Sequence, residues 1–120
     1  MPLQRFSLKA VQVMESIYEV TLLFDFYGAL LTENQKDVVR MHVLEDYSLG
    51  EISEILNISR QGVHDSLRRA LHALQAYEEA LHLVSRFQHI RALATEARGA
   101  APQDKDRFLD DIINYTMEID

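Results

Sequence analysis

The side chains best placed to do chemistry are concentrated in one short stretch, "ISRQGVHDSLRRA" (58–70). Arg60, His64 and Arg68 recur every four residues, so a helix would place them on one stripe, with Gln61 beside it. Such side chains suit nucleic acid, because arginine pairs with guanine, glutamine pairs with adenine, and further arginines bind phosphate. The predicted nucleic-acid or partner face comprises Ser59, Arg60, Gln61, His64, Arg68 and Arg69.

The other reactive side chains do not form a catalytic or metal-binding pattern. Glu79 and His82 have the i, i+3 spacing of carboxylate-bridged metal sites, but those sites need a second such pair, and the sequence has none. The five histidines include no HExxH motif, and there is no glycine-rich phosphate loop. Ser59 and Ser66 have no evident base partner. We therefore expect no catalytic residues, no bound metal and no cofactor.

Two helices joined by a tight turn are predicted to position the charged face. "SLGE" (48–51) is a capping box that opens a helix over 49–56, and Ser59 is a good N-cap for the next helix. The positions predicted to pack between the two helices are Leu49, Ile52, Ile55, Ile58, Val63 and Leu67. A structural hairpin with a solvated face would share much of this pattern, but the caps, the turn and the charged stripe together favour a helix-turn-helix.

Helical spacing recurs along the rest of the chain, which predicts an all-α fold. Helices are expected over about 7–31 and, after the capping box "TENQ" (32–35), to about 44. The helix that begins near 60 carries heptad-like spacing from Val63 to Val84, and its helical pattern continues, with room for a bend, to about 97. "ARGAAPQDKD" then interrupts the pattern. A last amphipathic helix over 104–117 is predicted to bury Phe108, Leu109, Ile112, Ile113 and Thr116.

These elements predict one domain with additions at both ends. Residues 1–13 are predicted to be a flexible extension, 14–98 a helix-turn-helix domain and 99–104 a linker. Residues 105–120 are predicted to form a helix packed on the same domain. The heptad-like apolar stripe from Val63 to Val84 could pack against another helix of the same chain or against a second copy in a homodimer. The shortness of the chain favours packing within the chain.

The charge of the chain is acidic and unevenly distributed. The net charge is −7 over 120 residues. Residues 47–70 carry three acids and three bases, whereas residues 99–120 carry six acids and two bases. A dedicated DNA-binding protein usually presents a clear positive face, so this charge balance argues against DNA binding as the function. The absence of cysteine fits a reducing cytoplasm, and the apolar stretch 17–31 is too short for membrane insertion.

The segment "LLFDFYGALLTENQKDVVRMHVLEDYSLGEISEILNISRQGVHDSLRRA" resembles the bacterial YlxM-like proteins. "FDFYGALLT", "DYSLGEI" and "ISRQGVHDSLRRA" are the most specific pieces, and the resemblance covers about 14–89 and favours Met14 as the start. It implies a helix-turn-helix bundle similar to region 4 of sigma factors, with a long fourth helix and a C-terminal helix. It also implies a non-enzymatic regulator or accessory of the signal recognition particle pathway, whose genes lie beside those of this family.

Three functions are compatible with these observations. The first is an accessory of the signal recognition particle that contacts its GTPase, its RNA or both. The second is a sequence-specific regulator that binds duplex DNA through Arg60, Gln61 and His64, with Arg68 and Arg69 on phosphate. The third is an interaction module that uses the arginine stripe for a protein partner.

Overall fold

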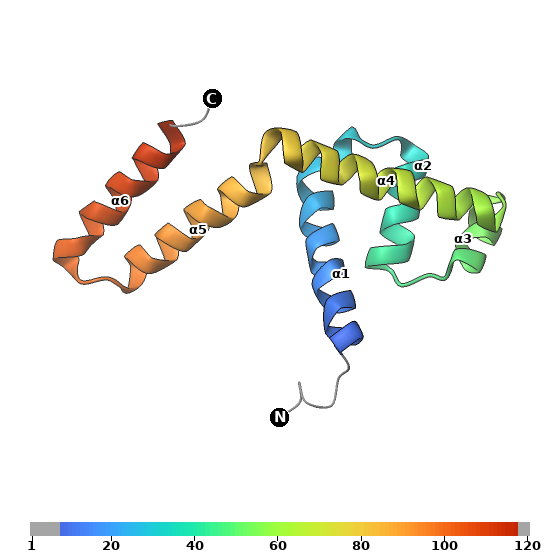
Figure 1. The fold of residues 1–120 in the computed structure, drawn as a ribbon, viewed down its shortest axis with the longest axis horizontal. Helices are drawn as coiled ribbons and strands as arrows, with labels where there is room; N and C mark the ends of the chain where they lie inside the picture. The colour runs from blue at the N-terminus through green and yellow to red at the C-terminus, as the bar shows by residue number, and fades with distance from the viewer. Residues whose placement is uncertain (1–7, 118–120) are drawn as a thin grey trace. The chain divides into compact units, whose positions relative to one another are not determined.

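The computed structural model describes the backbone of residues 8–117 and the side chains of residues 17–117. Within this range the chain forms six α-helices and no strand, which confirms the predicted all-α class. The helices are α1 (Leu8–Tyr27), α2 (Glu33–Val39), α3 (Leu49–Leu56), α4 (Arg60–Leu81), α5 (Leu83–Gly99) and α6 (Pro102–Met117) (Figure 1). Of the flexible extension predicted over 1–13, residues 1–7 lie outside the described residues, and residues 8–13 belong to α1.

The chain divides into two compact units, residues 1–81 with α1–α4 and residues 82–120 with α5 and α6. His82 separates α4 from α5 because its backbone adopts the left-handed conformation, with φ 56°. The helical pattern predicted to run to about 97 is therefore interrupted at His82. The domain boundary predicted after residue 98 consequently falls inside the second unit.

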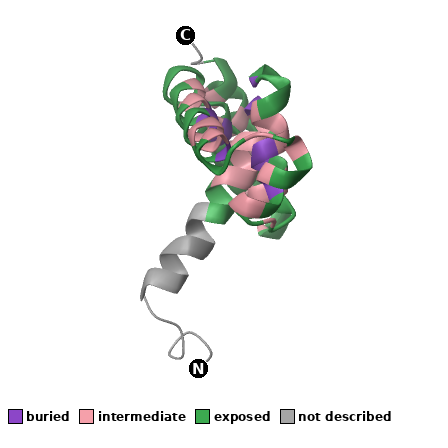
Figure 2. Ribbon diagram, turned by 90° about the vertical axis from the view of Figure 1, so that its right-hand side faces the viewer, coloured by how far each residue is buried: buried purple, intermediate pink, exposed green. Residues whose placement is uncertain are grey.

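The core of the first unit lies where α4 packs against α1, α2 and α3. Val38 of α2, Ile52 of α3 and Val63 of α4 are completely buried and form its centre. Figure 2 shows the buried residues on the inward faces of the helices and the exposed ones on their outer faces. The half-buried residues packed around this centre are Met41, Tyr47, Leu49, Leu56, Ile58 and Leu67. The predicted core positions on α4 and in the turn are thus confirmed.

The prediction that Ile55 packs inward is wrong. Its side chain is 54% exposed, while Ile52 is fully buried and Leu56 packs against the core. The reason is the angle between residues on a helix, since positions 49, 52 and 56 share one arc and position 55 lies to one side.

Thr32 begins α2 with the predicted capping box. The backbone N–H of Gln35 donates to the Thr32 hydroxyl at 3.2 Å, and the Thr32 N–H donates to the Gln35 side chain at 3.1 Å. Two backbone donors that the first turn of a helix cannot pair are satisfied in this way. The cap fixes the point at which the chain turns from α1 into α2.

The second unit is a pair of packed helices, α5 and α6. The rings of His89 and Tyr115 lie 4.3 Å apart between centroids and connect the two helices. The prediction that α6 buries Leu109, Ile113 and Thr116 is wrong, since Leu109 is 51% exposed, Ile113 is 56% exposed and Thr116 is exposed. Phe108 and Ile112 are half-buried. Within the second unit, α5 covers only one arc of α6, so the adjacent apolar positions lie outside this contact.

Tyr27 ties α1 to α4 inside the first unit. Its ring is 1% exposed, and its hydroxyl donates a 2.6 Å hydrogen bond to the carboxylate of Glu78. We expect Tyr27→Phe to lower the free energy of unfolding by about 1.5 kcal/mol, because a hydrogen bond to a charged group is lost while the ring stays packed. Tyr18→Phe is the matched control on the same helix, because Tyr18 is 62% exposed and should change stability little. Urea denaturation followed by circular dichroism measures both, and equal effects would contradict the assigned role of the Tyr27–Glu78 bond.

Candidate nucleic-acid interface

The helix-turn-helix begins at Ser48, where the second predicted capping box is formed. The Glu51 N–H donates to the Ser48 hydroxyl at 3.1 Å, and the Ser48 N–H donates to the Glu51 carboxylate at 3.1 Å. At the end of α3, Asn57 adopts the left-handed conformation with φ 56°, which turns the chain toward α4. The Ser53 hydroxyl donates to the carbonyl of Ile58 at 2.6 Å and holds the turn against α3.

Ser59 is the N-cap of α4, as predicted. Its hydroxyl accepts a 2.9 Å hydrogen bond from the N–H of Gly62. We expect Ser59→Ala to lower the free energy of unfolding by about 1 kcal/mol, because a backbone donor of the first turn loses its partner. Ser59→Asn keeps a capping oxygen and should remain close to the wild-type protein. Thermal denaturation of the three proteins measures the difference, and an unchanged Ser59→Ala would refute the capping role.

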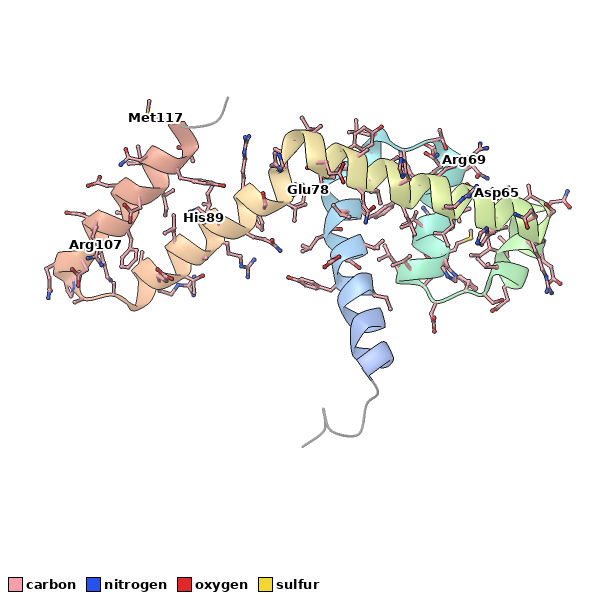
Figure 3. The ribbon with its side chains drawn as sticks, viewed as in Figure 1. Asp65, Arg69, Glu78, His89, Arg107 and Met117 are labelled. Atoms are coloured by element: carbon pink, nitrogen blue, oxygen red, sulfur yellow. The ribbon has the colours of Figure 1, made fainter. Side chains whose placement is uncertain are left out.

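The predicted site residues lie on the exposed surface of α4 and of its N-cap, over about the first three turns, where Val63 and Ala70 are the buried positions. We call this surface the recognition face, and it comprises Ser59, Arg60, Gln61, His64, Arg68 and Arg69, all of them exposed. The side chains of His64 and Arg68 are 56% and 70% exposed. Figure 3 shows Asp65 and Arg69 on the same helix. The structure therefore exposes all six residues and places Gln61, His64 and Arg68 on one side of α4 around Asp65. Their role in binding stays a prediction.

Asp65 is the residue of this surface that sequence reasoning missed. Its carboxylate accepts a 3.0 Å hydrogen bond from the Gln61 amide and lies 3.7 Å from the Arg68 guanidinium and 3.8 Å from His64 Nδ1. Three of the six residues of the recognition face thus converge on one carboxylate. The spacing contained the signal, since position 65 follows 61 by four residues and precedes 68 by three.

The Arg60 guanidinium lies beside the first turn of α3. A Cβ atom at Gly50 would lie 3.0 Å from this guanidinium, so a side chain at position 50 would displace it by a few tenths of an ångström. To contact a base, Arg60 would move away from Gly50. Because a flexible side chain makes this movement, its cost is small compared with a bidentate contact to guanine.

Ser66 has a structural partner on α2, since its hydroxyl donates a short hydrogen bond to the Asn34 side chain. An amide does not act as a base, so this contact gives Ser66 no activation as a nucleophile. The bond instead joins α2 to α4 beside the recognition face.

A groove extends the recognition face along α4. It has a volume of about 300 Å³ and is lined from α1 by Glu19, Val20 and Leu23, and from α4 by Arg68, Leu71, His72 and Gln75. Arg68 and His72 also line an adjoining shallow depression with Arg69. Arg68 and Arg69 therefore lie beside this groove, which also carries the acidic side chain of Glu19.

The described part of the chain has neither a metal-binding cluster nor a helix that could span a membrane. Residues 17–117 contain no group of three or more histidine or acidic side chains arranged to hold a metal ion. None of the described helices is both long enough and apolar enough to cross a membrane.

Comparison with known proteins places this architecture in one family. Residues 14–112 match the family UPF0122, described as "Putative helix-turn-helix protein, YlxM / p13 like". A UPF0122 protein of Thermoanaerobacter sp. (strain X514) is 61% identical over 71 residues, which is 59% of this chain and 61% of that protein. A UPF0122 protein of Acetivibrio thermocellus is 51% identical over 82 residues, covering 67% of this chain and 70% of the relative.

A UPF0122 protein of Listeria monocytogenes is 40% identical over 106 residues, covering 88% of this chain and 94% of the relative. The similarity to the Thermoanaerobacter protein thus spans about three fifths of each chain, and the similarity to the Listeria protein spans nearly all of both. The expected YlxM-like resemblance is confirmed. The chain belongs to the UPF0122 family of YlxM/p13-like helix-turn-helix proteins.

Proposed function

We propose that this protein is a non-enzymatic regulatory or accessory protein that binds nucleic acid by placing the first turns of α4 in the major groove of duplex DNA. The observation that carries the proposal is the recognition face, in which Arg60, Gln61 and His64 are exposed directly after the Ser59 cap. A recognition helix presents its N-terminal residues to base edges in this way. Arg68 and Arg69 lie two turns further on, where they would bind phosphate.

The few charges of the recognition face favour weak binding to DNA of any sequence. Selectivity for one sequence would then depend on individual side chains. The recognition face carries three arginines and surrounds Asp65, while the chain as a whole has a net charge of −7. Few cationic contacts to phosphate predict a shallow dependence of affinity on salt, with a slope near 0.9 for each neutralised phosphate. Discrimination between sequences would then come from the base-contacting side chains.

Selection from a pool of random duplex oligonucleotides tests this proposal. The expected result is enrichment of a short motif containing guanine and adenine, the partners of Arg60 and Gln61. Fluorescence anisotropy of the selected duplex against a scrambled duplex then gives the specificity ratio. Recovery of no motif, with equal affinity for both duplexes, would refute sequence-specific binding.

A second candidate is an accessory role in the signal recognition particle pathway, through its GTPase, its RNA or both. The resemblance to YlxM-like proteins motivates it, and the acidic surface favours it, since residues 99–120 carry six acids and two bases. An acidic surface suits a basic protein partner. A tagged pull-down from native lysate, with and without nuclease, tests this role. Recovery of the GTPase after nuclease treatment supports direct contact, and recovery of neither component refutes the role.

A further inference from the structure

Asp65 lies in the middle of the recognition face and contacts the side chains on both sides of it. It accepts from Gln61 at 3.0 Å, one turn earlier, and lies 3.7 Å from Arg68, one turn later. Its side chain is 40% exposed, so the carboxylate remains accessible while it makes these contacts. A surface that served only to attract phosphate would gain from a neutral residue at this position.

We infer that Asp65 is a specificity-determining residue, which weakens binding to the nucleic-acid backbone and accepts a hydrogen bond from the N4 amino group of cytosine. The inference rests on the proposed binding of duplex DNA by α4. It goes beyond that proposal because it assigns the acidic residue of the face a function that the arginines cannot supply.

The first part of the argument is electrostatic. In the unbound protein, the Asp65 carboxylate partly neutralises the Arg68 guanidinium 3.7 Å away. A phosphate that approaches Arg68 must compete with that carboxylate and is repelled by it, because like charges at short range are unfavourable. Binding to DNA of arbitrary sequence is therefore weakened more than binding to a site that gives the carboxylate a donor.

The second part of the argument is positional. Asp65 shares its side of α4 with Gln61 and Arg68, so a groove that admits these two also admits the carboxylate. An ionised carboxylate can only accept hydrogen bonds. In the major groove, cytosine presents the N4 amino group as a donor, and acidic side chains are its usual partners. A site with cytosine at this position offsets the desolvation of Asp65, and a site with thymine does not.

The hydrogen bond from Gln61 gives Asp65 a positioning role as well. The Gln61 amide is oriented by this bond, with its nitrogen on the protein side. Asp65→Asn keeps an oxygen acceptor for Gln61 and removes the charge, whereas Asp65→Ala removes both. The two variants therefore separate the electrostatic effect from the positioning effect.

The test measures binding of the full-length protein and its variants to duplex DNA by fluorescence anisotropy over a range of salt. Asp65→Asn should bind a random-sequence duplex three- to tenfold more tightly, and the salt slope should steepen by about 0.9 because Arg68 can neutralise one more phosphate. Glu79→Gln is the matched control, since Glu79 is an exposed acid on the same helix, about 21 Å further along. It should bind within twofold of the wild-type protein.

Oligonucleotide selection with the same proteins tests the contact to cytosine. The wild-type protein should prefer cytosine at one position by about 5- to 150-fold, and Asp65→Ala, which has no acceptor, should lose this preference. Asp65→Ala should also relax the position read by Gln61.

Three outcomes would overturn the inference. If Asp65→Asn binds random duplex no more tightly than the wild-type protein, Asp65 does not weaken backbone binding, and the proposed function survives. If Glu79→Gln gives the same gain as Asp65→Asn, the effect is one of net charge and not of position. If the wild-type protein binds no duplex even at low salt, the proposed function itself fails, and the inference fails with it.

Discussion

Replacing Ile52 by alanine should lower the free energy of unfolding of the first unit by about 2–5 kcal/mol. Ile52 is completely buried and packs with Val38 and Val63, so it joins three helices at one point. Removing most of its side chain deletes buried apolar contacts and leaves a cavity that three surrounding helices cannot fill. Because the same contact sets the angle between α3 and α4, we expect binding through the recognition face to weaken as well.

Ile55→Ala is the matched control for this prediction. It makes the same chemical change on the same helix, three residues away, at a side chain that is 54% exposed. It should change the free energy of unfolding by less than about 1 kcal/mol. Urea denaturation followed by circular dichroism gives both values. A loss at Ile55 equal to that at Ile52 would show that α3 turns a different arc toward the core.

The double variant Arg60→Ala/Arg68→Ala should weaken binding to a selected duplex by about 100-fold at physiological salt. Arg60 would lose a bidentate contact to a base, which is worth about 1–3 kcal/mol, and Arg68 would lose one phosphate. The slope of log affinity against log salt should become shallower by about 0.9. Both side chains are exposed, so the fold and its thermal stability should be unchanged.

Arg91→Ala/Arg98→Ala is the control for the loss of two positive charges. Both residues are exposed on α5, in the second unit, and neither belongs to the recognition face. This variant should bind the selected duplex within about twofold of the wild-type protein, because it leaves the proposed contacts of α4 with DNA intact. An equal loss in both double variants would mean that binding follows overall charge, and α4 would then have no special role.

The sequence by itself determined the local features of the protein. The capping boxes at Thr32 and Ser48 and the N-cap at Ser59 are formed as predicted, because each depends on residues within a few positions of one another. Helical periodicity gave the all-α class, and spacing placed the recognition face on the exposed side of α4. The quoted motifs identified the family, which the comparison confirms.

Only the tertiary structure decided which of several equivalent residues each contact uses. Ile55 and Leu56 both suit a core position, and the approach of α4 to α3 selects Leu56. Leu109 and Ile113 fit an apolar stripe of α6, but α5 covers only the neighbouring arc. His82 ends α4 within a pattern that remains helical on both sides. The position of the Arg60 guanidinium beside Gly50 depends on how α3 and α4 pack against each other. Periodicity reports which side of a helix is apolar, whereas burial and the orientation of side chains depend on the neighbouring helices that pack there.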